Sequence, residues 1–283
     1  MILQTSMSSQ TIFQTESNAL IILLAHNFTH KDLPEELQNI TIDIMQFLQE
    51  LKFTATAGSN ATLSISVKPK KIVHLFFAGI GEPKNKKYDL ETLRRAIGSG
   101  IKWARAHQYS EIALQLPDAK LYDVTTQYLA EQVTTISYIA FYRYDKFITS
   151  IAKKDRTKTI HLFICTNNKD LKTAQHGHDK GIIIAQAVNT AREWIDTPPS
   201  QLTPTVLAEH AQTIAKEQKM KCTVFGEKEI QKMGLNGIAG VSSGSDQDAK
   251  FVILEYKTKK PKAQTIAFVG KGITFDSGGL SIK

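Results

Sequence analysis

The chain has 283 residues, of which 42% are apolar and 22% are charged, and its formal net charge is +8. At about 150 residues per domain this length leaves room for two domains, and the composition excludes collagen-like and intrinsically disordered proteins. The longest apolar run, residues 19–25, is far shorter than the roughly 20 residues that cross a bilayer, so we expect no transmembrane helix.

The N-terminal residues and the positions of the two cysteines indicate the cellular compartment of the protein. Residues 1–10, MILQTSMSSQ, lack the basic start and the long apolar stretch of a secretory signal. Cys165 and Cys222 are far apart in sequence, and both fall in apolar segments typical of strands, where neither is expected to act as a nucleophile. We therefore expect a reduced, cytoplasmic protein.

The positive charge is unevenly distributed. Residues 1–67 contain 2 Lys or Arg against 6 Asp or Glu, whereas residues 68–110 contain 10 against 3, with lysine clusters at 68–71 and 84–87. Such clusters bind phosphate or nucleic acid in some proteins, but more commonly they form solvated faces or protect sheet edges. Binding of nucleic acid or a nucleotide through residues 68–110 is therefore kept as an alternative function.

Residues 1–166 are expected to form an N-terminal α/β domain, because apolar runs typical of buried strands alternate with amphipathic segments. Pro34, for example, suits a first helical turn and is followed by apolar residues at three- and four-residue spacing. The expected strands are residues 19–25, 71–79, 111–117 and 158–166, and the expected helices are residues 34–52, 89–107 and 123–144.

Residues 167–197 are expected to form a linking helix that stops at Pro198 and Pro199. Residues 198–283 are expected to belong to a second domain, which opens with a helix capped by Thr203. The expected elements are a helix at 204–218 and strands at 221–226, 250–256 and 264–270, with a Gly-rich stretch at 234–245.

His176 and His178 form an HGH pair that invites comparison with metal sites. Positions two apart point to different faces of a helix, whereas a two-histidine site on a helix needs a spacing of four. An exposed linker is the better interpretation of this stretch. The AGIG sequence at residues 78–81 is also a weak signal, because the third glycine and the lysine of a phosphate-binding loop do not follow.

Residues 269–283, VGKGITFDSGGLSIK, place Lys271, Asp276 and Lys283 among glycines directly after an expected buried strand. In α/β proteins, binding sites form at the carboxyl ends of such strands, and glycines let the backbone approach a ligand closely. From spacing alone, an ordinary Gly-rich loop with surface lysines is an equally good interpretation.

This segment resembles the signature of the leucyl aminopeptidase family, the two-metal cytosolic aminopeptidases. Residues 191–204, AREWIDTPPSQLTP, are similar to the family's entry into its catalytic domain, and residues 233–256 are similar to the Gly-rich stretch before its first motif strand. The resemblance implies a metal-dependent aminopeptidase that releases N-terminal, leucine-type residues from peptides. It also implies two divalent ions, Zn²⁺ or Mn²⁺, and a cytoplasmic homohexamer.

By this resemblance, Lys271 corresponds to a lysine metal ligand, Asp276 to the carboxylate that bridges both metals, and Lys283 to the catalytic lysine beside the substrate carbonyl. A lysine amine binds a metal only in its neutral form, which burial and a nearby cation favour. The two oxygens of Asp276 suit ions about 3.5–4 Å apart. A cationic Lys283 suits the stabilisation of an oxyanion.

The family takes its remaining metal carboxylates, and an arginine, from a later Asp and an Asn-Thr-Asp-Ala-Glu-Gly-Arg motif, neither of which occurs in this sequence. Asp246 and Asp248 precede the first ligand and are expected in a solvated turn. One carboxylate and one lysine are too few ligands for two ions. We therefore expect a chain that is truncated within the catalytic domain and inactive alone.

Overall fold

A computed structural model describes the chain except residues 41, 69–70, 151–155, 157, 260–261 and 277–283. It divides into two compact units, Met1–Ala191 and Arg192–Lys283, each of which combines helices with a β-sheet. The α/β class expected from the sequence is therefore confirmed. Among the described helices, none is both long enough and apolar enough to span a membrane.

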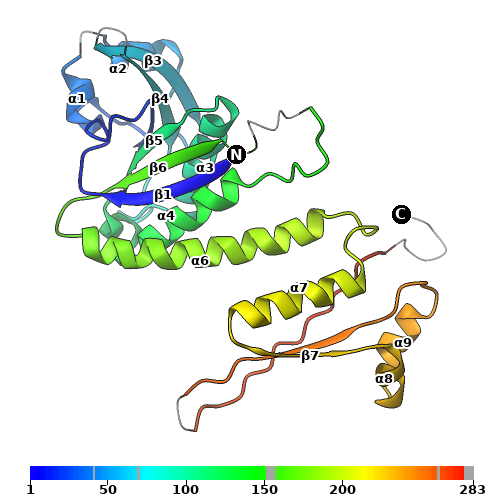
Figure 1. Ribbon diagram of the computed structural model, residues 1–283. Coiled ribbons are helices and arrows are strands. Elements are labelled where there is room, and N and C mark those ends of the chain that lie inside the picture. The colour runs from blue at the N-terminus through cyan, green and yellow to red at the C-terminus, as the bar shows by residue number, and fades with distance from the viewer. Residues whose placement is uncertain (41, 69–70, 151–155, 157, 260–261, 277–283) are drawn as a thin grey trace. The chain divides into compact units, whose positions relative to one another are not determined.

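The first unit is built on a six-stranded sheet with the strand order β1-β6-β5-β2-β4-β3 (Figure 1). Neighbouring strands run parallel, except β3 and β4, which are antiparallel. The strands are β1 (Ile2–Ser8), β2 (Ala19–Leu24), β3 (Asn60–Lys68), β4 (Lys71–Gly79), β5 (Glu111–Gln115) and β6 (Thr159–Cys165). Because β2 lies between β4 and β5, the connection from β4 to β5 crosses it.

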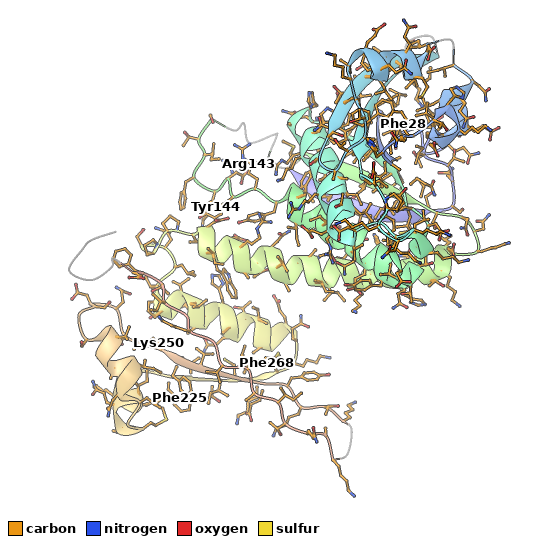
Figure 2. The ribbon with its side chains drawn as sticks, turned by 180° about the vertical axis from the view of Figure 1, so that it is seen from behind. Phe28, Arg143, Tyr144, Phe225, Lys250 and Phe268 are labelled. Carbon is orange, nitrogen blue, oxygen red and sulfur yellow. The ribbon has the colours of Figure 1, made fainter. Side chains whose placement is uncertain are left out.

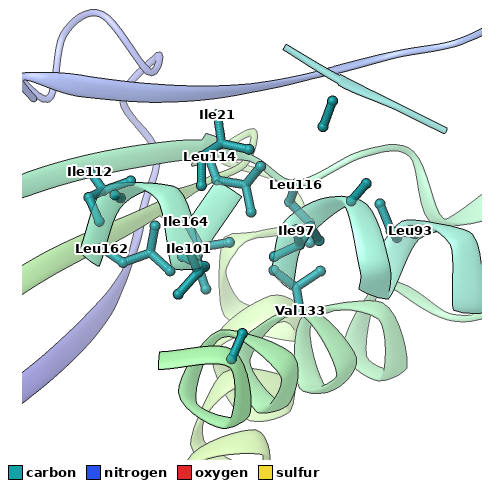
Figure 3. Packing of buried hydrophobic residues seen from close by; sticks show 14 of the residues in the cluster. Ile21, Leu93, Ile97, Ile101, Ile112, Leu114, Leu116, Val133, Leu162 and Ile164 are labelled. Carbon is teal, nitrogen blue, oxygen red and sulfur yellow. The ribbon is translucent and has the colours of Figure 1, made fainter. Parts of the chain in front are cut away.

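Hydrophobic cores lie on both faces of this sheet, and β2 contributes to each. Ala19 and Ile21 pack into one core, whereas Leu20, Ile22 and Leu24 pack into the other. The first core, shown in Figure 3, is covered by α3 (Leu90–Ala106) and α4 (Thr126–Phe141). Residues of α1 (Glu35–Gln38) and α2 (Ile44–Glu50) cover the second, and short 3₁₀ turns occupy His30–Asp32 and Ala119–Tyr122. A strand buried on both faces is a continuous apolar run, which is how the sequence identifies β2.

The structure corrects two expectations for this unit. The sequence does not predict the edge strands β1 and β3, and in β1 only Leu3 is buried, so the apolar signal is weak. The interpretation of residues 34–52 as one helix is also wrong, because α1 ends at Gln38 and α2 begins at Ile44. The Asp43 side chain accepts a hydrogen bond of 2.9 Å from the backbone N–H of Gln46 and so caps a separate helix.

Helix α6 (Leu171–Asp196) occupies most of the expected linking helix, and the division between the two units falls within it. In the second unit, α7 (Pro204–Glu217) begins where the sequence predicts, with Thr203 Oγ1 accepting from the Val206 N–H at 3.4 Å. The other described elements are β7 (Lys221–Phe225), α8 (Glu227–Lys232), α9 (Asn236–Ser242), which lies in the Gly-rich stretch, and β8 (Phe251–Glu255), antiparallel to β7.

Residues 264–270 are irregular in the structure, so the expectation of a strand there is wrong (Figure 1). A strand needs a hydrogen-bonded neighbour. Where the chain is described, β7 pairs with β8 and no strand pairs with this segment. Its apolar side chains are consequently open to solvent, and Phe268 and Val269 are 95% and 97% exposed.

Candidate functional site

Lys271 and Asp276, the expected metal ligands, lie on the irregular segment that continues from residues 264–270, and both are exposed. Lys283, the expected catalytic lysine, lies outside the described residues. Phe268, which Figure 2 labels on the same segment, is almost fully exposed. Within the described part of the second unit, Lys271 therefore lacks the burial that favours a neutral amine ligand.

One contact connects this segment to a regular element. A Cβ placed on Gly272 would lie 3.3 Å from Cδ2 of Leu207, so the backbone next to Lys271 passes close to α7. Helix α7 is well defined by its own sequence, because Thr203 caps it and Pro204 occupies its first turn. Helix α7 therefore passes close to this segment at Gly272.

The described donors do not form a complete two-metal site. In the part of the chain that the structure describes, no three His, Cys, Asp or Glu residues come together as a metal-binding group. Lys271 and Asp276 offer one amine and one carboxylate, whereas two ions need more donors than this. Asp246 and Asp248 do not add to the set, because both are exposed and Asp248 lies 3.6 Å from Lys250. Lys271 and Asp276 are therefore suited to a two-metal site only together with further ligands.

The HGH pair lies in a helix that packs against the first unit's sheet and α4, so its interpretation as an exposed linker is wrong. His176 and His178 lie in α6, and they do point to different faces: His176 is exposed, whereas His178 is only 3% exposed. Between them, Gly177 packs so tightly on α4 that a Cβ would overlap the carbonyl of Gln127. His178 Nε2 lies 2.8 Å from Thr5 Oγ1. The absence of a side chain at Gly177 lets α6 come close enough to bury His178.

The cysteines lie in strands, as the sequence predicts. Cys165 is fully buried at the end of β6, and burial raises the pKa of its thiol to about 12. Its thiolate is therefore scarce at neutral pH. Cys222 is partly buried in β7. Neither position has the features of an activated nucleophile.

A cavity of about 680 Å³ opens in the first unit, beyond the carboxyl ends of β2 and β4. Its lining includes Ile80 and Gly81 of the AGIG stretch, the capping residue Asp89 and Thr92 of α3. Gly81 has a φ of 73°, which glycine adopts without strain. The sequence alone does not point to this place, although both strands are apolar runs of the parallel type whose carboxyl ends share an edge.

Lys71 and Lys84, one from each lysine cluster, lie far apart. Lys71 begins β4, and Lys84 follows the end of that strand at Gly79. At about 3.3 Å per residue, β4 separates its two ends by roughly 26 Å. These two described lysines therefore do not favour a single nucleic-acid-binding patch.

Two models of one family match the chain. The N-terminal domain of the cytosol aminopeptidase family matches residues 27–150, and the catalytic domain of the same family matches residues 189–283. The two α/β units thus correspond to the two domains of a class of peptidases. The chain belongs to the cytosol aminopeptidase family.

Individual relatives agree with this assignment. The chain is 32% identical over 235 residues to a probable cytosol aminopeptidase of Rickettsia massiliae (strain Mtu5), a match that covers 83% of this chain and 46% of that protein. It is 30% identical over 240 residues to a probable cytosol aminopeptidase of Persephonella marina (strain DSM 14350 / EX-H1), covering 85% and 47%. The chain spans about half the length of the curated relatives it matches.

Solved structures share the fold. The bottromycin maturation enzyme BotP superposes with a TM-score of 0.73 at 22% identity, covering 94% of this chain and 51% of that one. The same enzyme in complex with Mn gives a TM-score of 0.72 at 21% identity. At this level of identity the likeness shows the fold alone.

Proposed function

We propose that the protein is a metal-dependent aminopeptidase that releases N-terminal amino acids, with a leucine-type preference, from peptides. The observation that carries the proposal is the match of residues 189–283 to the family's catalytic domain, because that stretch contains VGKGITFDSGG with Lys271 and Asp276. Relatives named as probable cytosol aminopeptidases support the same activity.

In this proposal, Lys271 and Asp276 are metal ligands and Lys283 is the catalytic lysine. Two divalent ions, Zn²⁺ or Mn²⁺, are the proposed cofactors, and they would supply Lewis acidity to the site. Asp276 would hold the ions through its carboxylate oxygens. Lys271 would bind an ion only as a neutral amine, so its segment would have to be covered in the active protein. Lys283 stays cationic and stabilises the negative charge that develops on the peptide carbonyl oxygen.

We further propose that residues 1–166 form the N-terminal domain, residues 167–197 the linker helix, and residues 198–283 the first part of the catalytic domain. The two family matches support this arrangement, because they leave residues 151–188 between them. The proposed setting is a cytoplasmic homohexamer, for which the support is the family resemblance.

The test is hydrolysis of leucine amide by the protein extended through the family's remaining metal ligands, measured beside salt-dependent filter binding of DNA. Hydrolysis that requires Zn²⁺ or Mn²⁺ would support the aminopeptidase. Tight DNA binding that weakens with salt, without hydrolysis, would overturn it in favour of the nucleic-acid alternative.

A further inference from the structure

The cavity lies beyond the carboxyl ends of the neighbouring parallel strands β2 and β4. In open α/β sheets, ligands bind outside the carboxyl ends of the strands. The volume of this cavity is about 680 Å³, and it is open to solvent, because Glu82, Lys84 and Asp89 of its lining are exposed.

The N-terminus of α3, which borders this cavity, does not favour the binding of a phosphate or a similar anion. The Asp89 carboxylate caps the helix, accepting from the backbone N–H of Thr92 at 2.8 Å and from its hydroxyl at 2.9 Å. These hydrogen bonds lower the pKa of Asp89, so its carboxyl is charged at neutral pH. The positive end of the helix is thus occupied by a carboxylate of the protein, and a phosphate placed there would meet negative charge.

Glu82 and Lys84 bring charges of both signs to the lining. Glu82 lies 3.3 Å from His26 Nε2, and its side chain is 69% exposed, so a second carboxylate oxygen has room for an ammonium group. Lys87 also lines the cavity, but its Nζ lies 3.3 Å from Asp123 and is already paired. Among the described residues, Lys84 makes no ion pair of comparable length. Its charge also helps to lower the pKa of Asp89, so a ligand carboxylate at Lys84 would share that ammonium with Asp89.

The rest of the lining is partly apolar. Ile80, Ala57 and the ring of Tyr88 contribute to it. Burial raises the pKa of the Tyr88 hydroxyl, which stays neutral and adds no charge. Apolar surface with a few charged groups is typical of small-molecule sites. The complementary ligand has one ammonium, one carboxylate and an apolar side chain.

We propose that this cavity binds a free α-amino acid with an apolar side chain. The ammonium lies at Glu82, the carboxylate lies at Lys84, and the side chain contacts Ile80 and Ala57. The site goes beyond the proposed peptidase function, because it is built entirely from the first unit and its occupancy does not require the metal ligands of the second.

The test is calorimetric titration of the 283-residue chain with L-leucine at neutral pH. We expect binding with a Kd near or below about 1 mM. N-acetyl-leucine, which lacks the ammonium, and leucine amide, which lacks the carboxylate, should bind at least about tenfold more weakly, because each loses a charge-assisted hydrogen bond.

Glu82→Gln and Lys84→Gln should each weaken leucine binding about tenfold for the same reason. Lys86→Gln is the matched control, since Lys86 is an exposed lysine of the same turn that does not line the cavity, and it should bind leucine like the parent chain. A thermal melt of each variant verifies that it is folded.

Any of the following results would overturn the proposal. The first is no leucine binding at concentrations well above the expected Kd. The second is binding of N-acetyl-leucine as tight as that of leucine, or an equal loss in Lys86→Gln and Lys84→Gln. The third is salt-sensitive binding of adenosine monophosphate in place of leucine, which would assign the cavity to phosphorylated ligands.

Discussion

Thr5 and His178 are 173 residues apart in sequence, yet Thr5 Oγ1 and His178 Nε2 lie 2.8 Å apart. The contact joins the edge strand β1 to helix α6. The other ring nitrogen of His178 lies 3.2 Å from both Gln175 Nε2 and Asp179 Oδ1. His178 is therefore an interior residue with partners for both nitrogens, and it holds α6 against the sheet.

Replacement of this histidine should destabilise the first unit. We predict that His178→Ala lowers the free energy of unfolding by about 1–3 kcal/mol, because it leaves a cavity and removes a hydrogen-bond partner of Thr5. His176→Ala, two residues earlier on the exposed face, should change it by less than about 0.5 kcal/mol. Urea denaturation measures both, and equal effects of the two substitutions would contradict this account.

The proposed end of the N-terminal domain near residue 166 predicts that residues 1–170 fold alone. All six strands of the large sheet lie within this piece, so we expect one cooperative thermal transition. A longer piece, residues 1–191, should melt at a higher temperature, because it restores the buried Ala174 and Ala185 of α6. Circular dichroism measures both melts. A gradual melt of the shorter piece would place the boundary elsewhere.

The helices and strands that the sequence predicts correctly are marked by patterns within their own residues. β2 and β4 are continuous apolar runs, and α3 begins after the capping residue Asp89. The elements that it misses depend on distant partners. β1 is a weakly apolar segment that becomes a strand by pairing with β6, where Ile2 lies opposite Thr159.

The errors near the candidate sites have the same origin. The polar HGH stretch suggests exposure, but packing of Gly177 against α4 buries His178. Residues 264–270 show the reverse, because their apolar sequence predicts a strand and no described neighbour pairs with them. The family resemblance locates Lys271 and Asp276 in the sequence but says nothing of their burial. The cavity beyond β2 and β4 depends on strand order, which no local pattern contains.

Thiol labelling tests the difference between the two cysteines. Burial raises the pKa of Cys165 to about 12, so near pH 8 its thiolate is much scarcer in the folded chain than in the unfolded chain. We predict that iodoacetamide modifies Cys222 well before Cys165, and that denaturant makes the rates similar. Mass spectrometry of tryptic peptides follows both sites. Rapid labelling of Cys165 in the folded chain would show that its environment is more open than described.

The 283-residue chain alone should have no aminopeptidase activity. Lys271 and Asp276 are too few donors to hold two ions against water, and Lys271 is exposed. The exposed Phe268 and Val269 should also promote association between copies, which light scattering would detect. The assay is hydrolysis of leucine amide with excess Zn²⁺ or Mn²⁺. Clear metal-dependent turnover would show that the chain supplies more ligands than the described residues provide.

The most direct test of the central claim compares Asp276→Ala with the parent sequence in a protein extended through the family's remaining ligands. Bound Zn²⁺ or Mn²⁺ and hydrolysis of leucine amide are measured on the same samples. We predict that the parent binds metal and hydrolyses the amide, and that Asp276→Ala loses bound metal and nearly all turnover because it lacks the shared carboxylate. Full metal content and normal turnover in Asp276→Ala would contradict the assignment.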